Sequence, residues 1–299
     1  MQPDWLWHKL RSGILSHMMY DSTRGVGKRL HTDQNAAEIS QEDTGTITAF
    51  TSNGFTVDAG TTNDLYVNDD SRTYVSWGWK ANGGTATATI SESGNNPAAV
   101  VQANATAGFS IISYTGTGSS GTIAHGLGAI PEMYIVKNRD AESNFEVFTN
   151  QIVTGENSVL RIDTAGAKAD SGVTLPTSSV ITVTQGANQN ADGQKYIMYC
   201  FKSIQGYSKI GSYTGNGNAN GAFVYTGFKP AWVMIKRTSG SENWVIWDNK
   251  RDPFNNFYHV LLANATSAED TSNAGSSGRY VGDFLSNGFK LRNTHDTSN

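Results

Sequence analysis

Short apolar runs, separated by polar and glycine-rich segments, recur along the whole chain. Three of these runs lead from a proline to a lysine six residues later, in the segments Pro3–Lys9, Pro131–Lys137 and Pro230–Lys236. Apolar side chains occupy both alternating sets of positions in these runs, which is typical of strands that are covered on both faces. A second apolar run ends twelve residues after each lysine, at Asp21, Thr149 and Asp248. The pattern predicts three antiparallel hairpins joined by polar loops.

Other phrases occur twice at matching offsets. YTGTG (114–118) and YTGNG (213–217) begin seventeen residues before their prolines, SNGF recurs at 52–55 and 286–289, and YVSWGWK (74–80) matches YIMYCFK (196–202). We therefore predict an all-β protein of three related antiparallel β-sandwich repeats, jelly-roll or concanavalin-like. The expected divisions are 1–81 for the first repeat without its opening strand, 82–111 for an extended insert or linker, 112–204 for the second repeat, and 205–299 for the third repeat without its closing strand.

Gly116, Gly118 and Gly121 match the G-x-G-x-x-G fingerprint of dinucleotide-binding loops. That function requires a helix directly after the loop, and the following segment, with Gly126, Gly128 and Pro131, favours a turn and a strand instead. The second copy of the phrase carries an extra residue between its glycines. The glycines therefore indicate a turn and not a phosphate-binding loop.

Composition narrows the function classes further. Only 16% of the 299 residues are charged, 32 are glycine, and the net charge is −4, which disfavours long helices and nucleic-acid binding. Cys200, the single cysteine, lies in an apolar run and is expected to be a buried small hydrophobe. We find no signal peptide and no apolar stretch long enough for membrane insertion.

Few residues suggest chemistry. The six histidines are scattered, and the chain has neither a nucleophile elbow nor a zinc-protease motif. Asp21 and Asp248 could suggest the paired carboxylates of a glycosidase. Each is followed three residues later by an arginine, Arg24 or Arg251, so we expect a turn stabilised by an Asp–Arg pair or an Asx-turn. We predict no enzymatic activity, no catalytic residue and no cofactor.

An acidic segment at 63–71 is the one candidate metal loop. It contains Asp64, Asp69 and Asp70, whose oxygen atoms could bind Ca²⁺. The spacing is not that of an EF-hand, so a solvated loop is the expected structure and no metal site is predicted.

The phrases DWLWHKLRS, DSTRGVGKRL, AGFSIISYTGTGSSGTIAHGLGAIPEMYIVKNR and GSYTGNGNANGAFVYTGFKPAWVMIKRT together resemble repeated modules in virion proteins of marine tailed phages. Those proteins are described as tail fibres or tail proteins, often with concanavalin-like β-sandwich modules. The resemblance covers most of the chain and is weakest over 150–195. It implies a structural, host-facing virion protein that assembles in the host cytoplasm, but it carries over no catalytic or binding residue. Because these modules normally have both terminal strands, we expect the chain to be part of a longer protein.

Two functions follow from this reading. The first is a tail fibre or receptor-binding component that attaches to host-surface glycan, and the alternative is a purely architectural capsid or tail decoration or spacer. The implied partners are other virion proteins, further copies of the chain with a trimer favoured, and a host glycan, but neither nucleic acid nor membrane. A recognition site is expected in the unshared loop 249–259, because aromatic rings beside amide and guanidinium donors suit a sugar. Its candidate residues are Arg251, Phe254, Asn255, Asn256, Phe257 and Tyr258. The alternative is that these rings pack against a neighbouring module or subunit.

Overall fold

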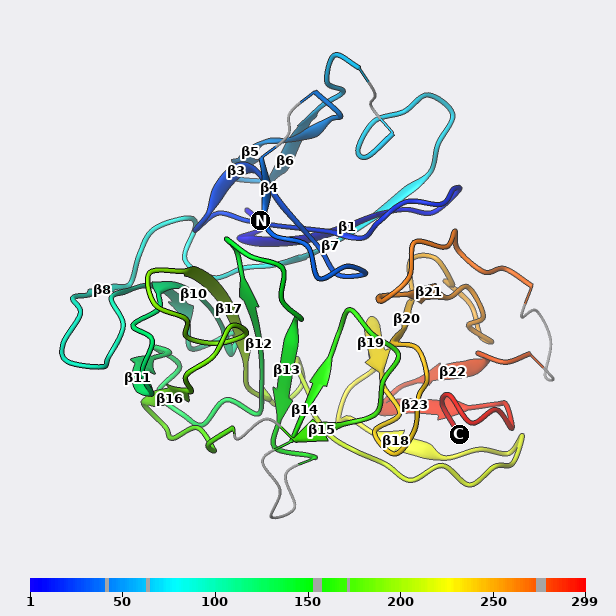
Figure 1. Cartoon of the computed structure of the whole chain (residues 1–299). Helices are drawn as coiled ribbons and strands as arrows, with labels where there is room; N and C mark the ends of the chain where they lie inside the picture. The colour runs from blue at the N-terminus through cyan, green and yellow to red at the C-terminus, as the bar shows by residue number, and fades with distance from the viewer. Residues whose placement is uncertain (41–42, 63–64, 153–157, 171–172, 273–277) are drawn as a thin grey trace.

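Antiparallel strands make up the regular structure of the protein, as seen in a computed structural model (Figure 1). The structure describes residues 1–299 except 41–42, 63–64, 153–157, 171–172 and 273–277. Within the described residues there are 23 strands and no helix. The prediction of an all-β, sandwich-like protein is confirmed.

The strands fall into three groups, called here the first, middle and third units. The first unit contains β1 (Trp5–Leu10), β2 (Met18–Asp21), β3 (Gly25–His31), β4 (Ile39–Ser40), β5 (Thr46–Thr51), β6 (Gly54–Asp58) and β7 (Tyr74–Trp79). Five of them form a sheet in the order β4-β3-β2-β1-β7, and β5 and β6 form a separate hairpin.

The middle unit is the largest. Its strands are β8 (Ala88–Ile90), β9 (Ala99–Asn104), β10 (Phe109–Thr115), β11 (Gly121–Ala124), β12 (Met133–Asn138), β13 (Glu146–Thr149), β14 (Ser158–Arg161), β15 (Ala169–Asp170), β16 (Val180–Val183) and β17 (Lys195–Phe201). Eight of them form the sheet β15-β14-β13-β12-β17-β10-β9-β8, and β11 pairs with β16.

The third unit has two small sheets. Its strands are β18 (Phe223–Tyr225), β19 (Trp232–Ile235), β20 (Val245–Asp248), β21 (Leu261–Leu262), β22 (Gly282–Leu285) and β23 (Gly288–Leu291). They pair in the orders β19-β20-β21 and β18-β23-β22.

The three proline-to-lysine segments form β1, β12 and β19, and each pairs with the next strand of its hairpin in the same register. Opposite residues at the start of these hairpins are Trp5 and Asp21, Met133 and Thr149, and Trp232 and Asp248. On their other edges, β1 pairs with β7 and β12 pairs with β17. In the described structure, β19 has a strand partner on one edge only.

Residues 82–111 differ from the expected extended insert or linker. They supply β8, β9 and the start of β10 to the sheet of the middle unit. The segment is rich in small residues, so its strands lack the bulky pattern that marks the others. Val101 and Ala99 of β9 nevertheless bury their side chains in the core of this unit.

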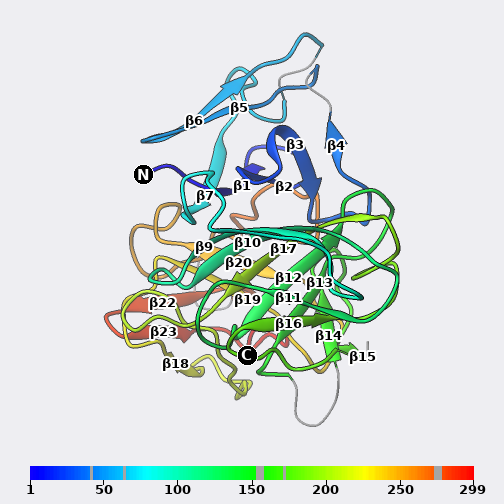
Figure 2. The same cartoon turned by 90° about the vertical axis from the view of Figure 1, so that its left-hand side faces the viewer.

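Each unit has its own hydrophobic core, and a fourth core lies between the units. The central core contains side chains of all three units, among them Trp5, Trp7, Tyr199, Phe201, Trp244 and Ile246. The rings of Trp5 and Tyr199 stack with their centroids 4.7 Å apart, which joins the first unit to the middle one. Seen from the side, the sheet of the first unit lies above that of the middle unit (Figure 2). The strands are apolar on both faces because one face meets the unit's own core and the other meets the central core.

Equivalent backbone hydrogen bonds join the units in a closed ring. In every junction a residue six positions after the lysine of the repeated segment donates its N–H to a loop of a neighbouring unit. These bonds run from Leu15 to Thr266 (2.8 Å), from Ser143 to Asn35 (2.9 Å) and from Glu242 to Ala165 (2.8 Å). The first unit therefore contacts the third, the middle unit contacts the first, and the third contacts the middle.

Candidate functional site

Arg251, the first candidate of the loop 249–259, is a buried structural residue. Its Nε donates to Asp248 Oδ2 at 2.6 Å, and its Nη1 donates to Glu269 Oε1 at 2.8 Å. Only 2% of the side chain is exposed. The guanidinium is therefore engaged within the protein and is not presented to a ligand.

Three other candidates of the loop also serve the fold. Phe257 is fully buried, with its ring centroid 5.0 Å from that of Trp247 and 4.5 Å from that of Phe284. The amide of Asn255 both donates to and accepts from the backbone of Phe284, at 3.0 and 2.9 Å. Asn256 Nδ2 donates to Asp283 Oδ1 at 2.8 Å. These contacts fasten the loop to β22.

Phe254 and Tyr258 remain available at the surface. Phe254 is 83% exposed, and Tyr258 is half-buried with its ring 4.3 Å from that of His259. The loop encloses a hollow of about 220 Å³, which the side chains of Asp252 and His259 also line. Asp252 Oδ1 lies 2.6 Å from His259 Nδ1. The loop therefore leaves the rings of Phe254 and Tyr258 at the surface beside the exposed residues Asn255 and Asn256, whereas Arg251 and Phe257 are buried.

The expected Asp–Arg turns are present in two units with the same geometry. Asp21 Oδ1 accepts the N–H of Arg24 at 2.8 Å, and Asp248 Oδ1 accepts the N–H of Arg251 at 2.9 Å. In each turn the arginine also reaches a glutamate, Glu38 or Glu269, at 2.9 and 2.8 Å. Burial alone would raise the pKa of Asp248, but the charge and hydrogen bonds of Arg251 outweigh it and hold that pKa below its ordinary value.

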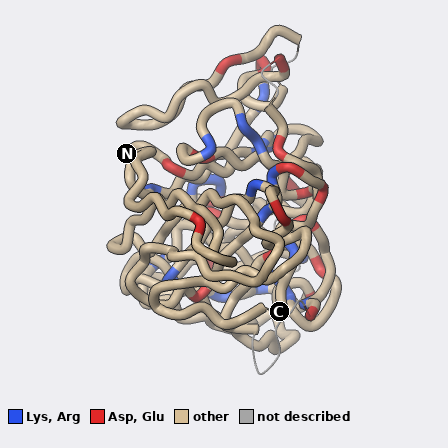
Figure 3. The backbone as a smooth tube through the Cα atoms, turned by 60° about the vertical axis from the view of Figure 1, so that its left-hand side comes forward, with Lys and Arg blue, Asp and Glu red and all other residues tan. Residues whose placement is uncertain are grey.

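A ring from another unit completes each of these turns. Tyr199 Oη in β17 donates to Asp21 Oδ2 at 2.7 Å, and Trp77 Nε1 in β7 donates to Asp248 Oδ2 at 3.1 Å. Tyr199 and Trp77 lie at the same position of the two matching strands, opposite Ile135 and Trp7 respectively. Figure 3 marks Lys and Arg in blue and Asp and Glu in red, and the two colours adjoin at several places on the tube. Because each carboxylate bonds both to its own turn and to a ring of another unit, Asp21 and Asp248 connect the units.

The lysines of the three repeated segments have similar structural roles. The Nζ atoms of Lys9, Lys137 and Lys236 donate to the backbone oxygens of Leu10, Ser143 and Arg237 at 2.7, 2.9 and 2.6 Å. Burial lowers the pKa of each of these lysines to about 8. These ammonium groups hold the hairpin loops that contact the neighbouring units.

The other candidates of the sequence are the acidic segment 63–71, Cys200 and the glycine-rich turn. Asp64 lies outside the described residues, and Asp69 pairs with Arg72 at 3.2 Å. The described residues contain no group of three His, Cys, Asp or Glu side chains suited to a metal ion. Cys200 is buried, and burial raises the pKa of its thiol to about 12. At Gly116 and Gly121, a Cβ atom would overlap a backbone oxygen of Ala191 or Asn95, so these glycines permit close packing of the turn.

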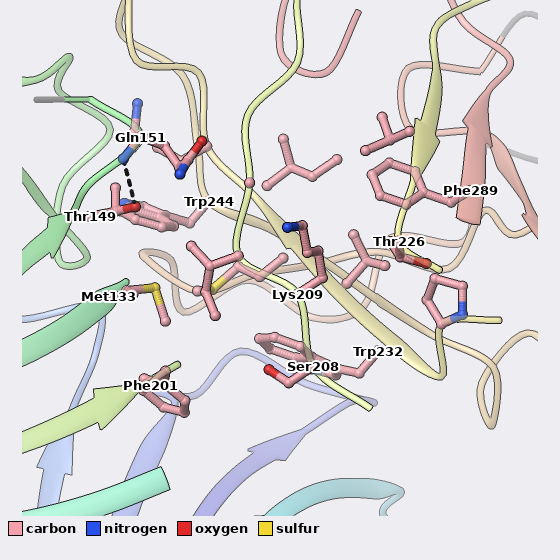
Figure 4. A pocket seen from close by; sticks show the side chains of 18 of the residues that line it. Met133, Thr149, Gln151, Phe201, Ser208, Lys209, Thr226, Trp232, Trp244 and Phe289 are labelled. Carbon is pink, nitrogen blue, oxygen red and sulfur yellow. Dashed lines mark hydrogen bonds between the residues drawn. The ribbon is translucent and has the colours of Figure 1, made fainter. Parts of the chain in front are cut away.

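An apolar groove of about 1150 Å³ lies beside β19 and is here called the β19 groove (Figure 4). Trp232 and Met234 of β19 form one wall, and residues 208–215 form another. Thr149 of the middle unit lines the far end, where its Oγ1 accepts the N–H of Gln151 at 3.3 Å. One feature of the sequence points to this groove. The phrase YVSWGWK (74–80) and its match YIMYCFK (196–202) have no third copy in residues 1–299.

Comparison with known proteins gives a family and no function. Within the described residues, no helix has the length and apolar character needed to cross a membrane. No curated protein and no solved structure matches the chain. A family model described as "Domain of unknown function (DUF7483)" matches residues 1–299. The chain is therefore a member of the DUF7483 family.

Proposed function

We propose that this protein is a structural component of a tailed-bacteriophage virion, in a tail fibre or tail protein, and that it is not an enzyme. The virion assignment rests on the resemblance of its repeated phrases to marine phage virion modules. The absence of a catalytic role rests on how the polar groups are used. Asp21 and Asp248, the acids best suited to chemistry, each have an oxygen shared by an arginine and by a ring of another unit.

The observation that carries the structural role is the closed ring of units around one aromatic core. Backbone hydrogen bonds join the three units at every junction, and fully buried rings such as Trp5, Trp7 and Tyr199 lie in the core that the units share. Such an arrangement stabilises a rigid body, which is what a load-bearing particle component requires. Partners would then be other virion proteins or further copies of the chain.

Host-glycan recognition is the second candidate function. It is favoured by Phe254, which is 83% exposed beside the hollow of about 220 Å³ at loop 249–259. An exposed ring can stack on the apolar face of a sugar. We expect Phe254→Ala virions to assemble normally and to adsorb less well to host cells if this loop binds glycan. Normal adsorption of these virions would leave the architectural role alone.

The virion assignment is tested by immunogold electron microscopy of purified phage particles with an antibody against this protein. We expect gold label at one fixed place on the tail, and an intact host polysaccharide after incubation with the purified protein. Particles without the protein would overturn the virion assignment. Release of reducing sugar by wild type, lost in Asp248→Asn, would overturn the non-enzymatic role.

A further inference from the structure

We propose that the open edge of β19 binds a β-strand from outside residues 1–299, of the alternating aromatic or apolar kind seen in β7 and β17. The added strand completes the third unit in the way that β7 completes the first unit and β17 completes the middle one. It lies antiparallel to β19 within the β19 groove, with aromatic or apolar side chains at alternate positions. This inference concerns a binding edge of the protein and does not depend on a place in a virion.

The other two units show what is missing beside β19. In the first unit, β7 covers the edge of β1 from Trp5, opposite Trp79, to Leu10, opposite Tyr74. In the middle unit, β17 covers the edge of β12 in the same register, with Met133 opposite Phe201. Trp232 is equivalent to Trp5 and Met133, because all three lie two residues after the proline of their segments. The described residues place no strand opposite Trp232 on that edge.

The backbone of β19 is oriented to receive a strand. The N–H of Asn249 donates to the oxygen of Ala231 at 2.9 Å, so Ala231 faces β20. Hydrogen-bonding groups of successive strand residues point to opposite edges, so those of Trp232 and Met234 point into the β19 groove. An unpaired row of such groups is a template for pairing with another chain.

The opposite wall of the groove is the third unit's counterpart of β10. Tyr114 of β10 donates its hydroxyl to the oxygen of Gln189 at 2.5 Å, and Tyr213 donates in the same way to Ser298 at 2.5 Å. In the middle unit β17 lies between β12 and β10 and pairs with both. Residues 209–215 of the third unit form no strand in the described structure. The groove therefore has the position of one missing strand between two walls.

The chemistry of the occupant follows from the strands that fill the equivalent positions. Ile197, Tyr199 and Phe201 of β17 turn alternate side chains into the central core, and Val75, Trp77 and Trp79 of β7 lie in it or against it. The ring at the middle position donates to Asp21 or Asp248 of another unit. In the middle unit, Thr149 holds the position of Asp21 and Asp248. Thr149 lines the groove, where the middle side chain of the added strand lies. Two phrases of this kind occur in residues 1–299, YVSWGWK and YIMYCFK, and the strands that they form, β7 and β17, are already paired, so the occupant comes from outside these residues.

A peptide tests the binding edge directly. A fluorophore-labelled peptide with the sequence of β7 and its lysine, YVSWGWK, is titrated into the whole protein, and binding is followed by anisotropy. We expect saturable binding, and none by a scrambled peptide that breaks the apolar alternation. Met234→Pro removes the N–H that faces the groove and is expected to weaken binding by roughly tenfold or more. Met234→Ala is the matched control, since it also removes the side chain but keeps the N–H, and it should bind within roughly threefold of wild type.

Cross-linking tests the register without relying on the proline variant. Trp77 lies opposite Trp7, and Met234 is the residue of β19 equivalent to Trp7. A Met234→Cys protein should therefore form a disulfide with the peptide carrying Cys in place of Trp77, and little with the peptide carrying Cys in place of Ser76. Equal cross-linking of both peptides, equal binding of the scrambled peptide, or no binding of YVSWGWK to folded protein would each overturn the proposal. None of these outcomes bears on the presence of the protein in virions.

Discussion

Trp77 Nε1 donates a hydrogen bond of 3.1 Å to Asp248 Oδ2, across 171 positions of the chain. The bond joins β7 of the first unit to the Asp–Arg turn of the third. Asp248 also accepts from Arg251, whose side chain is 2% exposed. One carboxylate thus stabilises both a local turn and the contact between two distant units.

Replacing Asp248 with Ala should destabilise the protein strongly. The change leaves the buried guanidinium of Arg251 without its closest carboxylate, and removing one partner of a buried ion pair typically costs about 3–5 kcal/mol. The free energy of unfolding from urea denaturation measures this loss. Asp69→Ala is the matched control, because Asp69 and Arg72 form an exposed pair of the same spacing, and it should cost less than about 1 kcal/mol. Equal losses in the two variants would contradict the junction role of Asp248.

Acid should weaken the fold through the buried carboxylates. The folded pKa values of Glu38, Asp248 and Glu269 lie below their ordinary values because arginines outweigh the effect of burial. Their contribution to stability is therefore fully present above the unfolded pKa of about 4 and is lost as the pH falls through the lower folded pKa. Urea unfolding at pH 6, 4 and 3 should show this fall, with a shallower slope in Asp248→Asn. The same slope in wild type and Asp248→Asn would show that this carboxylate does not contribute.

Mild alkali should stabilise the protein. The folded pKa values of Lys9 and Lys137 are about 8, below the ordinary 10.5, because burial disfavours the ammonium form. The unfolded chain therefore binds more protons than the folded one between these values, and the free energy of unfolding rises with pH in this window. Guanidinium denaturation at pH 7.5, 8.5 and 9.5 should show the rise, and Lys137→Met should reduce it. Lys80 is exposed, so Lys80→Met should leave the slope unchanged.

Two phenylalanines of the loop 249–259 should respond in opposite ways. Phe257 is fully buried between Trp247 and Phe284, so Phe257→Ala should cost about 3–5 kcal/mol of stability. Phe254 is 83% exposed, and Phe254→Ala should change stability by less than about 0.5 kcal/mol. Thermal unfolding followed by circular dichroism compares the two variants. A large loss in Phe254→Ala would show that this ring packs rather than protrudes.

Sequence patterns predicted the local structure of this protein well. The offsets from Pro3, Pro131 and Pro230 gave the starts and the registers of β1, β12 and β19, because strand pairing preserves spacing. The Asp–Arg spacing at Asp248 likewise predicted a turn that is closed by local hydrogen bonds.

The sequence patterns did not predict the contacts between segments that are distant in the chain. Nothing near Trp77 indicates that its ring meets Asp248, because that contact depends on how the units close into a ring. The strands of 82–111 were missed because their small residues lack the bulky alternation on which strand prediction depends. In the loop 249–259, composition suggested recognition for Phe257, whose burial is decided by β22 and not by its neighbours in the chain.

The central core has a consequence for how the protein melts. Modules strung in a row share only their end contacts, and each can lose its structure while the others stay intact. Here Trp5, Tyr199 and Trp244, from three different units, lie in the same core, so no unit can unravel without exposing the side chains of the other two. Unfolding should therefore be one cooperative transition, with equal calorimetric and van't Hoff enthalpies, despite a sequence that reads as a series of repeats.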